Sequence, residues 1–137
     1  MAITSPMNPE IKALWVQWLR DNADSQGFSA LQTAEGGFCC MGGLCELALN
    51  AGIVDRSYRD TYVLYGPTGT DPVTEGWADL LLPAVVSEWA GLGLVDNPVV
   101  MAGAADDSEP VQAALTELND EWQLNFHQIA DLIEEQL

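Results

Sequence analysis

The sequence predicts an α+β fold, in which about four helices pack on a small antiparallel sheet or hairpin. Its 137 residues are 48% hydrophobic, which is enough apolar material for the core of a single domain spanning residues 1–137. Segments with helical spacing of apolar residues alternate with β-branched, aromatic and Gly-rich segments. Residues 1–7 precede the first such segment, and we expect them to be flexible.

A first helix is predicted to begin after Asn8. Asn is a favoured N-cap residue, and Pro9 suits the first helical position because its missing N–H would be unpaired there in any case. The helix should end in the polar cluster between Asp21 and Asp24. Its buried face is expected to contain the apolar residues at helical spacing, which are Ile11, Leu14, Trp15, Trp18 and Leu19.

The next segment is expected to form a short hairpin and then a helix. Residues 28–32 and 38–40 are predicted to pair around a Gly-rich turn at residues 35–37. Helical spacing then covers Cys40–Asn50, and Gly52 is placed to end this helix in the left-handed conformation. Gly42 and Gly43 weaken its first turn, which indicates that another backbone packs closely there.

The middle of the chain is harder to interpret. Residues 61–65 are β-branched and aromatic and are predicted to form a strand, and residues 66–72 a loop. Pro83 is predicted to lie in the first turn of another helix, which Gly91 or Gly93 ends. Residues 96–109 are expected to be a polar connection, and Pro110 to begin a further helix.

The last predicted helix begins at Asn125, where Gln128 completes a capping box. Glu134 and Glu135 lie at its C-terminal end, which is unfavourable for the helix dipole, so this helix should fray or depend on tertiary contacts. We expect it to form the core together with the first helix and the 40–50 helix. Its buried face should contain Phe126, Ile129, Ala130, Leu132 and Ile133.

The negative charge limits the classes of partner. Four Lys and Arg face 21 Asp and Glu, which gives a net charge of −17. Repulsion from phosphates opposes binding to nucleic acid and to anionic membranes, so the natural complement is a basic protein surface. Alternatively, the acidic composition reflects genome bias or a saline habitat and has no specific role. The candidate partner-binding carboxylates are Asp106, Asp107 and Glu109, which lie together in the polar connection.

Three cysteines are the main candidates for chemistry. Cys39, Cys40 and Cys45 would supply thiolates for zinc, and His127, the single histidine, would be a fourth ligand. Their spacing does not match paired zinc ligands, so cysteines buried in the core are the preferred interpretation, and a metal- or thiol-dependent site is the alternative. The sequence contains no nucleophile, phosphate-loop or dinucleotide motif, so we predict neither an enzyme nor a cofactor.

The location is expected to be the cytoplasm. No apolar run reaches the roughly 18 residues that a membrane-spanning helix needs. The N-terminus also lacks a basic segment followed by an apolar one, which is the pattern of a signal peptide.

Several motifs together point to a family. With them the chain resembles a family of small uncharacterised proteins, encoded mostly by bacteriophages, over the stretch from Trp18 to Glu134. The family more usually has Leu and Val at positions 41 and 43, and a glycine between Asp120 and Phe126, which this chain lacks. The motifs are Gln26-Gly27-x3-Leu31, Phe38-Cys39-Cys40-Met41-Gly42-Gly43-Leu44-Cys45, Leu82-Pro83-x5-Trp89-x-Gly91-Leu92, Leu118-Asn119-Asp120 and Phe126-x2-Ile129-Ala130-x2-Ile133-Glu134.

The resemblance implies a phage origin, and hence the cytoplasm of the infected host cell. It implies no particular activity, so it assigns no catalytic residue. Together with the small size, the charge and the lack of a catalytic motif, it favours a phage accessory protein that binds and modulates a host protein, in host takeover or anti-defence, by binding rather than catalysis. The alternatives are the metal- or thiol-dependent site and a structural virion component.

Overall fold

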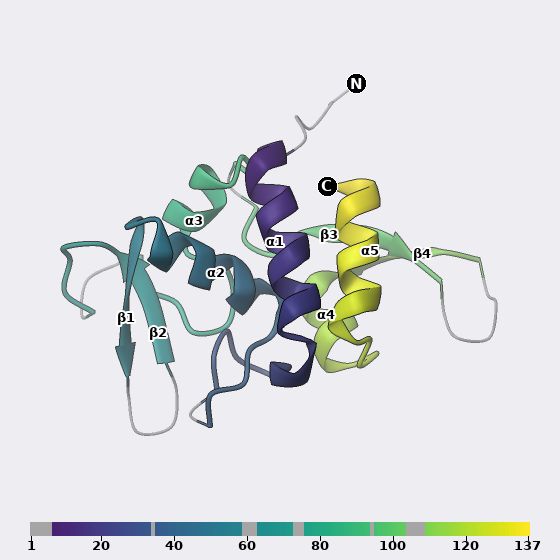
Figure 1. Ribbon diagram of the computed structural model, residues 1–137, viewed down its shortest axis with the longest axis horizontal. Coiled ribbons are helices and arrows are strands. Elements are labelled where there is room, and N and C mark those ends of the chain that lie inside the picture. The colour runs from purple at the N-terminus through teal and green to yellow at the C-terminus, as the bar shows by residue number, and fades with distance from the viewer. Residues whose placement is uncertain (1–6, 34, 59–62, 73–75, 94, 104–108) are drawn as a thin grey trace.

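The computed structural model describes residues 7–137 apart from 34, 59–62, 73–75, 94 and 104–108 (Figure 1). It confirms the α+β fold, with five α-helices and two antiparallel two-stranded sheets among the described residues. The helices are α1 (Pro9–Asp21), α2 (Cys40–Asn50), α3 (Ala84–Trp89), α4 (Leu115–Asp120) and α5 (Phe126–Gln136). The strands are β1 (Val54–Tyr58), β2 (Val63–Pro67), β3 (Val99–Ala102) and β4 (Val111–Ala114), and a single 3-10 turn, Ala23–Ser25, follows α1.

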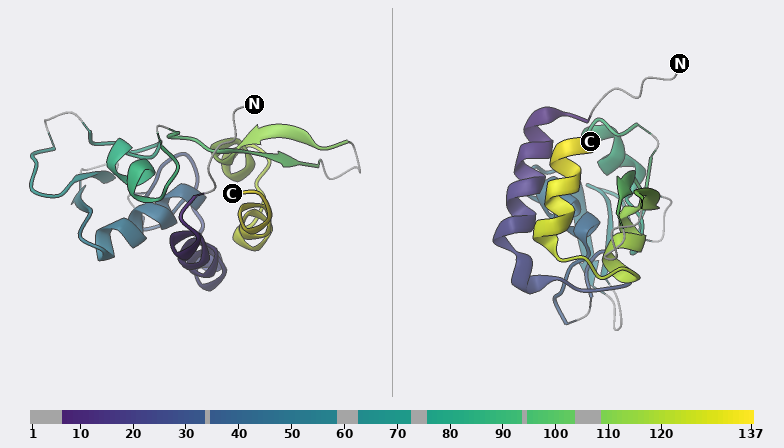
Figure 2. Two further views of the ribbon diagram at one scale, coloured as in Figure 1. Left: turned by 90° about the horizontal axis from the view of Figure 1, so that it is seen from above. Right: turned by 90° about the vertical axis from the view of Figure 1, so that its right-hand side faces the viewer.

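Helices α1 and α5 lie side by side on one face of the molecule (Figure 2). Both begin as predicted: Asn8 Oδ1 accepts from the N–H of Glu10 at 2.9 Å, and Asn125 and Gln128 form the capping box. The C-terminal half of α5 is held by α1, because Arg20 pairs with Asp131 at 2.8 Å. The unfavourable charges at the end of α5 are therefore offset by tertiary contacts.

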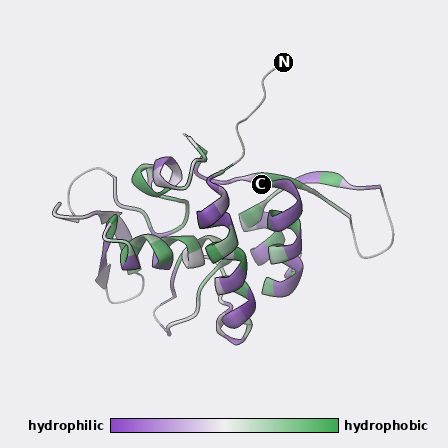
Figure 3. Ribbon diagram, turned by 45° about the horizontal axis from the view of Figure 1, so that its top comes forward, coloured by the Kyte–Doolittle hydropathy of each residue, from purple (hydrophilic) through white to green (hydrophobic). Residues whose placement is uncertain are grey.

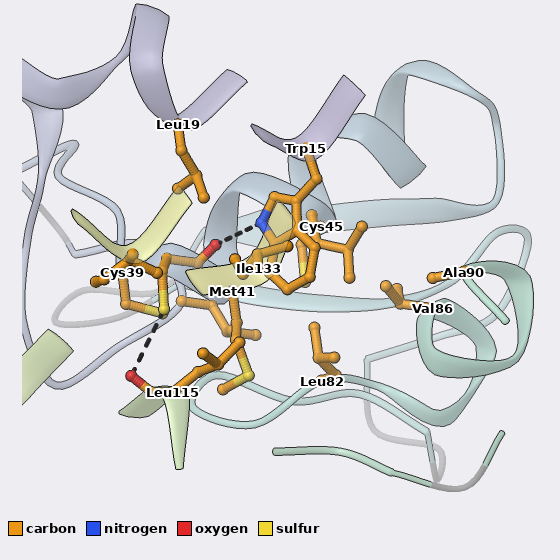
Figure 4. Packing of buried hydrophobic residues seen from close by; sticks show 14 of the residues in the cluster. Trp15, Leu19, Cys39, Met41, Cys45, Leu82, Val86, Ala90, Leu115 and Ile133 are labelled. Carbon is orange, nitrogen blue, oxygen red and sulfur yellow. Dashed lines mark hydrogen bonds between the residues drawn. The ribbon is translucent and has the colours of Figure 1, made fainter. Parts of the chain in front are cut away.

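The core lies between this helix pair and the rest of the chain, with α2 at its centre (Figure 4). Trp15 is fully buried, and its Nε1–H donates to the backbone carbonyl of Cys40 at 2.9 Å. Hydrophilic residues follow the outer faces of α1 and α5, and hydrophobic residues face inward (Figure 3). The largest fully buried side chains are Trp15, Tyr65, Phe126, Met7, Leu19, Leu31, Met41, Leu44, Leu115, Leu118, Ile129 and Ile133.

The two glycines at the start of α2 are required by close packing. A Cβ at Gly42 would overlap the backbone carbonyl of Leu31, which confirms the predicted close approach of another backbone. A Cβ at Gly43 would instead overlap the indole ring of Trp18. Gly52 ends the turn after α2 with a φ of 78°, as predicted.

The first sheet packs against α2 and differs in part from the prediction. Strands β1 and β2 pair antiparallel, with Arg56 opposite Tyr65. The predicted strand at 61–65 corresponds to β2, but β2 continues through Pro67 into the predicted loop, and residues 61 and 62 lie outside the described ones. The sequence did not predict β1, because Asp55, Arg56 and Ser57 do not have strong strand propensity.

The second sheet replaces a predicted helix. The 96–109 connection contains β3, and Pro110 precedes β4 rather than opening a helix, so this prediction was wrong. Strand β4 pairs antiparallel with β3, with Ala113 opposite Val100, and α4 begins only at Leu115. The fixed φ of proline suits a strand start as well as a first helical turn, so pairing with β3 decides the outcome.

Three further expectations are corrected or refined. The predicted hairpin at 28–40 contains only isolated bridges, in which Phe38 pairs with both Gln26 and Gln32. Leu14 is 55% exposed, because it lies outside the buried stripe of α1, which contains Ile11, Trp15, Val16 and Leu19. Helix α3 ends before Gly91, which has a φ of 83° and lies against the backbone of residues 7 and 8.

At the N-terminus, the described chain begins with an ordered residue. Met7, the last residue of the segment expected to be flexible, is buried, and its N–H donates to the carbonyl of Leu137 at 3.2 Å. Residues 1–6 lie outside the described part of the chain. None of the described helices is long and apolar enough to cross a membrane.

Candidate functional site

The three cysteines lie in the hydrophobic core. Cys39, Cys40 and Cys45 are buried, and none of them forms a disulfide. Burial raises the pKa of the Cys39 thiol to about 12 and raises the pKa values of Cys40 and Cys45 well above the ordinary value. The Cys40 thiol donates to the Leu115 carbonyl at 3.6 Å (Figure 4). The thiols are therefore protonated at neutral pH, which is the state of structural rather than reactive cysteines.

The structure does not gather the predicted metal ligands. His127 lies in the first turn of α5 with its side chain exposed, whereas the cysteines are enclosed by the core. Within the described residues, no three His, Cys, Asp or Glu side chains are placed to hold one metal ion.

A buried amide network joins the motifs of the resemblance. Asn119 is fully buried in α4, and its Oδ1 accepts from the N–H of Cys40 at 3.2 Å and from Gln26 Nε2 at 3.0 Å. Its Nδ2 donates to the Gly27 carbonyl at 2.9 Å and to Asp120 Oδ1 at 2.8 Å. Both polar atoms of the Asn119 amide are therefore hydrogen-bonded. The network connects residues 26–27 and the start of α2 to α4.

A second polar network lies between α2 and the first sheet. Arg56 Nη1 pairs with Glu46 Oε2 at 2.7 Å, and the Tyr65 hydroxyl donates to the same oxygen at 2.6 Å. The Tyr65 hydroxyl also lies 3.0 Å from Gln32 Oε1. Burial, followed by the bond to the Glu46 carboxylate, raises the pKa of Tyr65 above its ordinary value. Tyr65 is thus held as a neutral hydrogen-bond donor, not as a general base.

An open concavity of about 520 Å³ lies beside β1, and its lining includes Arg56, Tyr58 and Trp77. The Arg56 guanidinium lies 5.2 Å from the centroid of the Tyr58 ring. Since Glu46 already neutralises Arg56 and Asp55 adds a carboxylate to the lining, this concavity offers aromatic surface but no unpaired positive charge from the described residues. It is poorly suited to an anionic substrate.

The cations of the described chain are engaged within the fold. Lys12 Nζ donates to the Glu134 carbonyl at 3.3 Å, Arg20 pairs with Asp131 and Glu134, and Arg56 pairs with Glu46. Arg59, the remaining basic residue, lies outside the described residues. The surface that remains for a partner is therefore dominated by carboxylates.

The candidate contact carboxylates lie next to the second sheet in the sequence. Asp106 and Asp107 lie outside the described residues, and Glu109 is exposed one residue before Pro110. The segment that connects β3 to β4 therefore carries three acids and no basic residue.

The β3–β4 ribbon, residues 99–102 and 111–114, extends from the body past α5 (Figures 1 and 2). Three of the eight exposed large hydrophobic residues of the described chain lie on these two short strands: Val99 (46% exposed), Met101 (49%) and Val111 (49%). The side-chain amide of Gln136, at the end of α5, forms two hydrogen bonds with the backbone of Met101. Its Oε1 accepts from the Met101 N–H at 2.7 Å, and its Nε2 donates to the Met101 carbonyl at 2.8 Å.

A family model described as a domain of unknown function, DUF8296, matches residues 7–137. The chain belongs to this family. The match spans the amide network, the cysteines and the β3–β4 ribbon, so it includes all the residues that the structure describes. No curated protein sequence and no solved structure matches the chain significantly.

The sequence signalled some of these residues and missed others. The Leu118-Asn119-Asp120 motif of the resemblance marked Asn119, although its part in the network was not predicted. Nothing marked Gln136 or the exposed ribbon, because the segments that form β3 and β4 were assigned to a connection and a helix. Contacts of residues distant in sequence leave no local pattern from which they can be predicted.

Proposed function

We propose that this chain is an acidic accessory protein that binds a basic surface of another protein and acts by binding rather than by catalysis. The resemblance to phage-encoded proteins favours a host protein as the partner, in host takeover or anti-defence. The observation that carries the proposal is the charge: net −17, with all three described cations already engaged within the fold. A cationic protein is the partner that such a surface attracts most strongly.

The arrangement of the titratable groups supports binding over chemistry. The thiols are buried and protonated, the Tyr65 hydroxyl is bound by a carboxylate, and His127 stands alone at the surface. Nucleophilic catalysis needs a nucleophile and a base within hydrogen-bond reach of each other and of solvent. The described residues present no such pair, whereas the exposed apolar ribbon offers contact area for a protein.

The test is capture of host proteins on the immobilised chain across a series of salt concentrations. We expect one or a few basic proteins to be enriched at low salt, and the binding constant of each, measured with the purified protein, to weaken as salt rises. Duplex DNA should not bind the chain at physiological salt. A control bait in which several exposed acids, among them Glu10 and Glu88, are changed to amides should retain less of the partner.

Three results would contradict the proposal. Enrichment of nothing at low salt would favour the view that the acidic composition has no specific role. Binding that is insensitive to salt would exclude an electrostatic contact. Detection of the chain in purified phage particles would favour a structural virion component instead.

A further inference from the structure

The two edges of the β3–β4 ribbon are treated differently by the fold. An edge strand presents unpaired backbone N–H and C=O groups, and proteins usually cover or block them. On β3 the edge is covered at Met101, because the Gln136 amide bonds both backbone groups of this residue. This side-chain amide takes the place that a neighbouring strand would occupy.

The edge of β4 is open. In an antiparallel pair, successive residues point their backbone groups alternately toward the partner strand and away from it. Since Met101 points away from β4, Val100 and Ala102 point toward it, as do their partners Ala113 and Val111. The bond from the Leu115 N–H to the Pro98 carbonyl at 2.9 Å fits the same alternation.

By this register, the backbone of Gln112 points away from β3. Gln112 is exposed, and within the described part of the chain no hydrogen bond from outside the β3–β4 pair reaches its backbone. The N–H of Ala114 points to the same side. Strand β4 itself carries no charge, no proline and no bulge, which are the usual means of blocking an edge.

We infer that the β4 edge binds an extended segment of the cationic partner by strand addition, with apolar side chains alternating with Lys or Arg. The inference rests on the proposed function and names its contact surface. Backbone bonds to Gln112 and Ala114 supply the pairing. Val99, Met101 and Val111 supply exposed apolar area on the two faces of the ribbon.

The charge decides what occupies the edge. The segment between β3 and β4 carries three acids and no basic residue, and the whole chain carries a charge of −17. A second copy would bring the same charge to the contact and be repelled, and an anionic membrane would be repelled as well. A strand with Lys or Arg is attracted from a distance and pairs with the same edge.

The test uses the full chain labelled with nitrogen-15 and a synthetic peptide of about ten residues in which Val or Thr alternates with Lys. We expect saturable shifts of the amide signals of Gln112, Ala114 and their neighbours, and slower hydrogen exchange at these two amides. A control peptide with the same side chains but N-methylated backbone amides cannot donate to an edge, and should cause no such shifts.

A matched pair of variants separates the backbone from the side chain. Gln112→Pro removes the outward N–H without removing a bond to β3, and Gln112→Ala removes only the side chain. We expect the peptide Kd to rise at least about tenfold for Gln112→Pro, because an edge donor is lost, and to stay nearly unchanged for Gln112→Ala. Far-UV circular dichroism and the amide signals of β3 report whether the ribbon of each variant is intact.

Failure of the inference and failure of the proposed function give different results. Strand addition would be overturned by amide shifts on the helices instead of β4, or by the absence of a saturable shift at millimolar peptide. Equal peptide Kd values for the two Gln112 variants would overturn it as well. If the peptide did not slow hydrogen exchange at the Gln112 amide of the unmodified chain, that result would also overturn strand addition, and it would not rely on any variant. Self-association through β4 in sedimentation experiments would assign the edge to a second copy instead. In each case salt-sensitive capture of a basic protein would still support the proposed function.

Discussion

The side-chain oxygen of Asn119 accepts a hydrogen bond from the backbone N–H of Cys40, 79 residues earlier in the chain, at 3.2 Å. The first N–H groups of a helix have no partner within it, and Cys39 provides no side-chain cap for α2. Asn119 therefore caps α2 from a distance, while its Nδ2 bonds the carbonyl of Gly27. The start of the central helix depends on a residue of α4.

Replacing Asn119 should destabilise the fold. Asn119→Ala would leave the Cys40 N–H and the Gly27 carbonyl without partners in the core, which lowers the free energy of unfolding by about 2–4 kcal/mol. Urea denaturation measures the change. Asp120→Asn is the matched control, because it keeps an acceptor oxygen for the Ser29 N–H, and it should change stability by less than about 1 kcal/mol. Equal losses for both variants would contradict a special role for Asn119.

Adding one methyl group at Gly42 should also destabilise the fold, although alanine favours helices. The methyl would overlap the Leu31 carbonyl, and this strain should exceed the helix-propensity gain of about 1 kcal/mol. We expect Gly42→Ala to lower the free energy of unfolding by at least about 2 kcal/mol. Asn50→Ala, at the exposed end of the same helix, should be neutral or slightly stabilising. A stabilised Gly42→Ala variant would show that α2 does not pack against the 26–32 segment.

Stability should decrease at alkaline pH. Burial raises the pKa of Cys39 to about 12 and also raises those of Cys40, Cys45 and Tyr65, so the folded chain keeps protons that the unfolded chain releases. This stabilisation is complete below the unfolded thiol pKa of about 8.5 and is lost as pH rises toward the folded value. The Cys39 thiol should contribute a slope of about −1.4 kcal/mol per pH unit within that window, and Cys40 and Cys45 should steepen the decline in the same direction.

Denaturation midpoints at about pH 8 and about pH 11 measure this slope. Cys39→Ala is the control, because removing one titrating thiol should make the decline shallower by that thiol's share. The thiols of the native chain should also react slowly with a disulfide reagent near neutral pH and rapidly after unfolding. Rapid reaction of a native thiol would indicate an accessible, functional cysteine and would contradict the buried arrangement.

The two arginine ion pairs should differ in their effect on stability. Arg56 and Glu46 have side chains 25% and 18% exposed, whereas Asp131 and Glu134, the partners of Arg20, are 70% and 66% exposed. Arg56→Met would leave the Glu46 carboxylate half-buried with only the Tyr65 hydroxyl, and should cost about 1–3 kcal/mol. Arg20→Met should cost less than about 1 kcal/mol. Thermal unfolding of both variants compares them, and the reverse order would contradict the burial of Glu46.

Local signals explain the parts of the fold that were predicted correctly. The bounds of α1, α2 and α5 agree with their caps and apolar spacing, because the Asn8 and Asn125 caps and the Gly52 turn depend on a few adjacent residues. The cysteines were expected in the core because their spacing does not match paired zinc ligands and free Cys is usually buried, and they are buried there.

Where two conformations suited the same residues, the sequence was not sufficient. Pro110 is compatible with a helix or a strand, and the bonds between β3 and β4 select the strand. Leu14 has the spacing of a buried residue, yet it is 55% exposed, because the neighbouring elements cover the stripe of α1 that contains Ile11, Trp15 and Leu19. Propensity is weak compared with the contacts that tertiary packing adds.

By itself, the sequence determined the α+β class, the three helices that form the core and the excess of negative charge, because composition and short-range spacing are enough to specify them. Only the tertiary structure decided that Asn119 caps α2, that Gln136 covers the edge of β3 at Met101 and that the edge of β4 stays open. Each of these features joins backbone groups to partners far away in the chain. Hydrogen bonds of this kind depend on how the elements come together in space, which no local pattern of residues encodes.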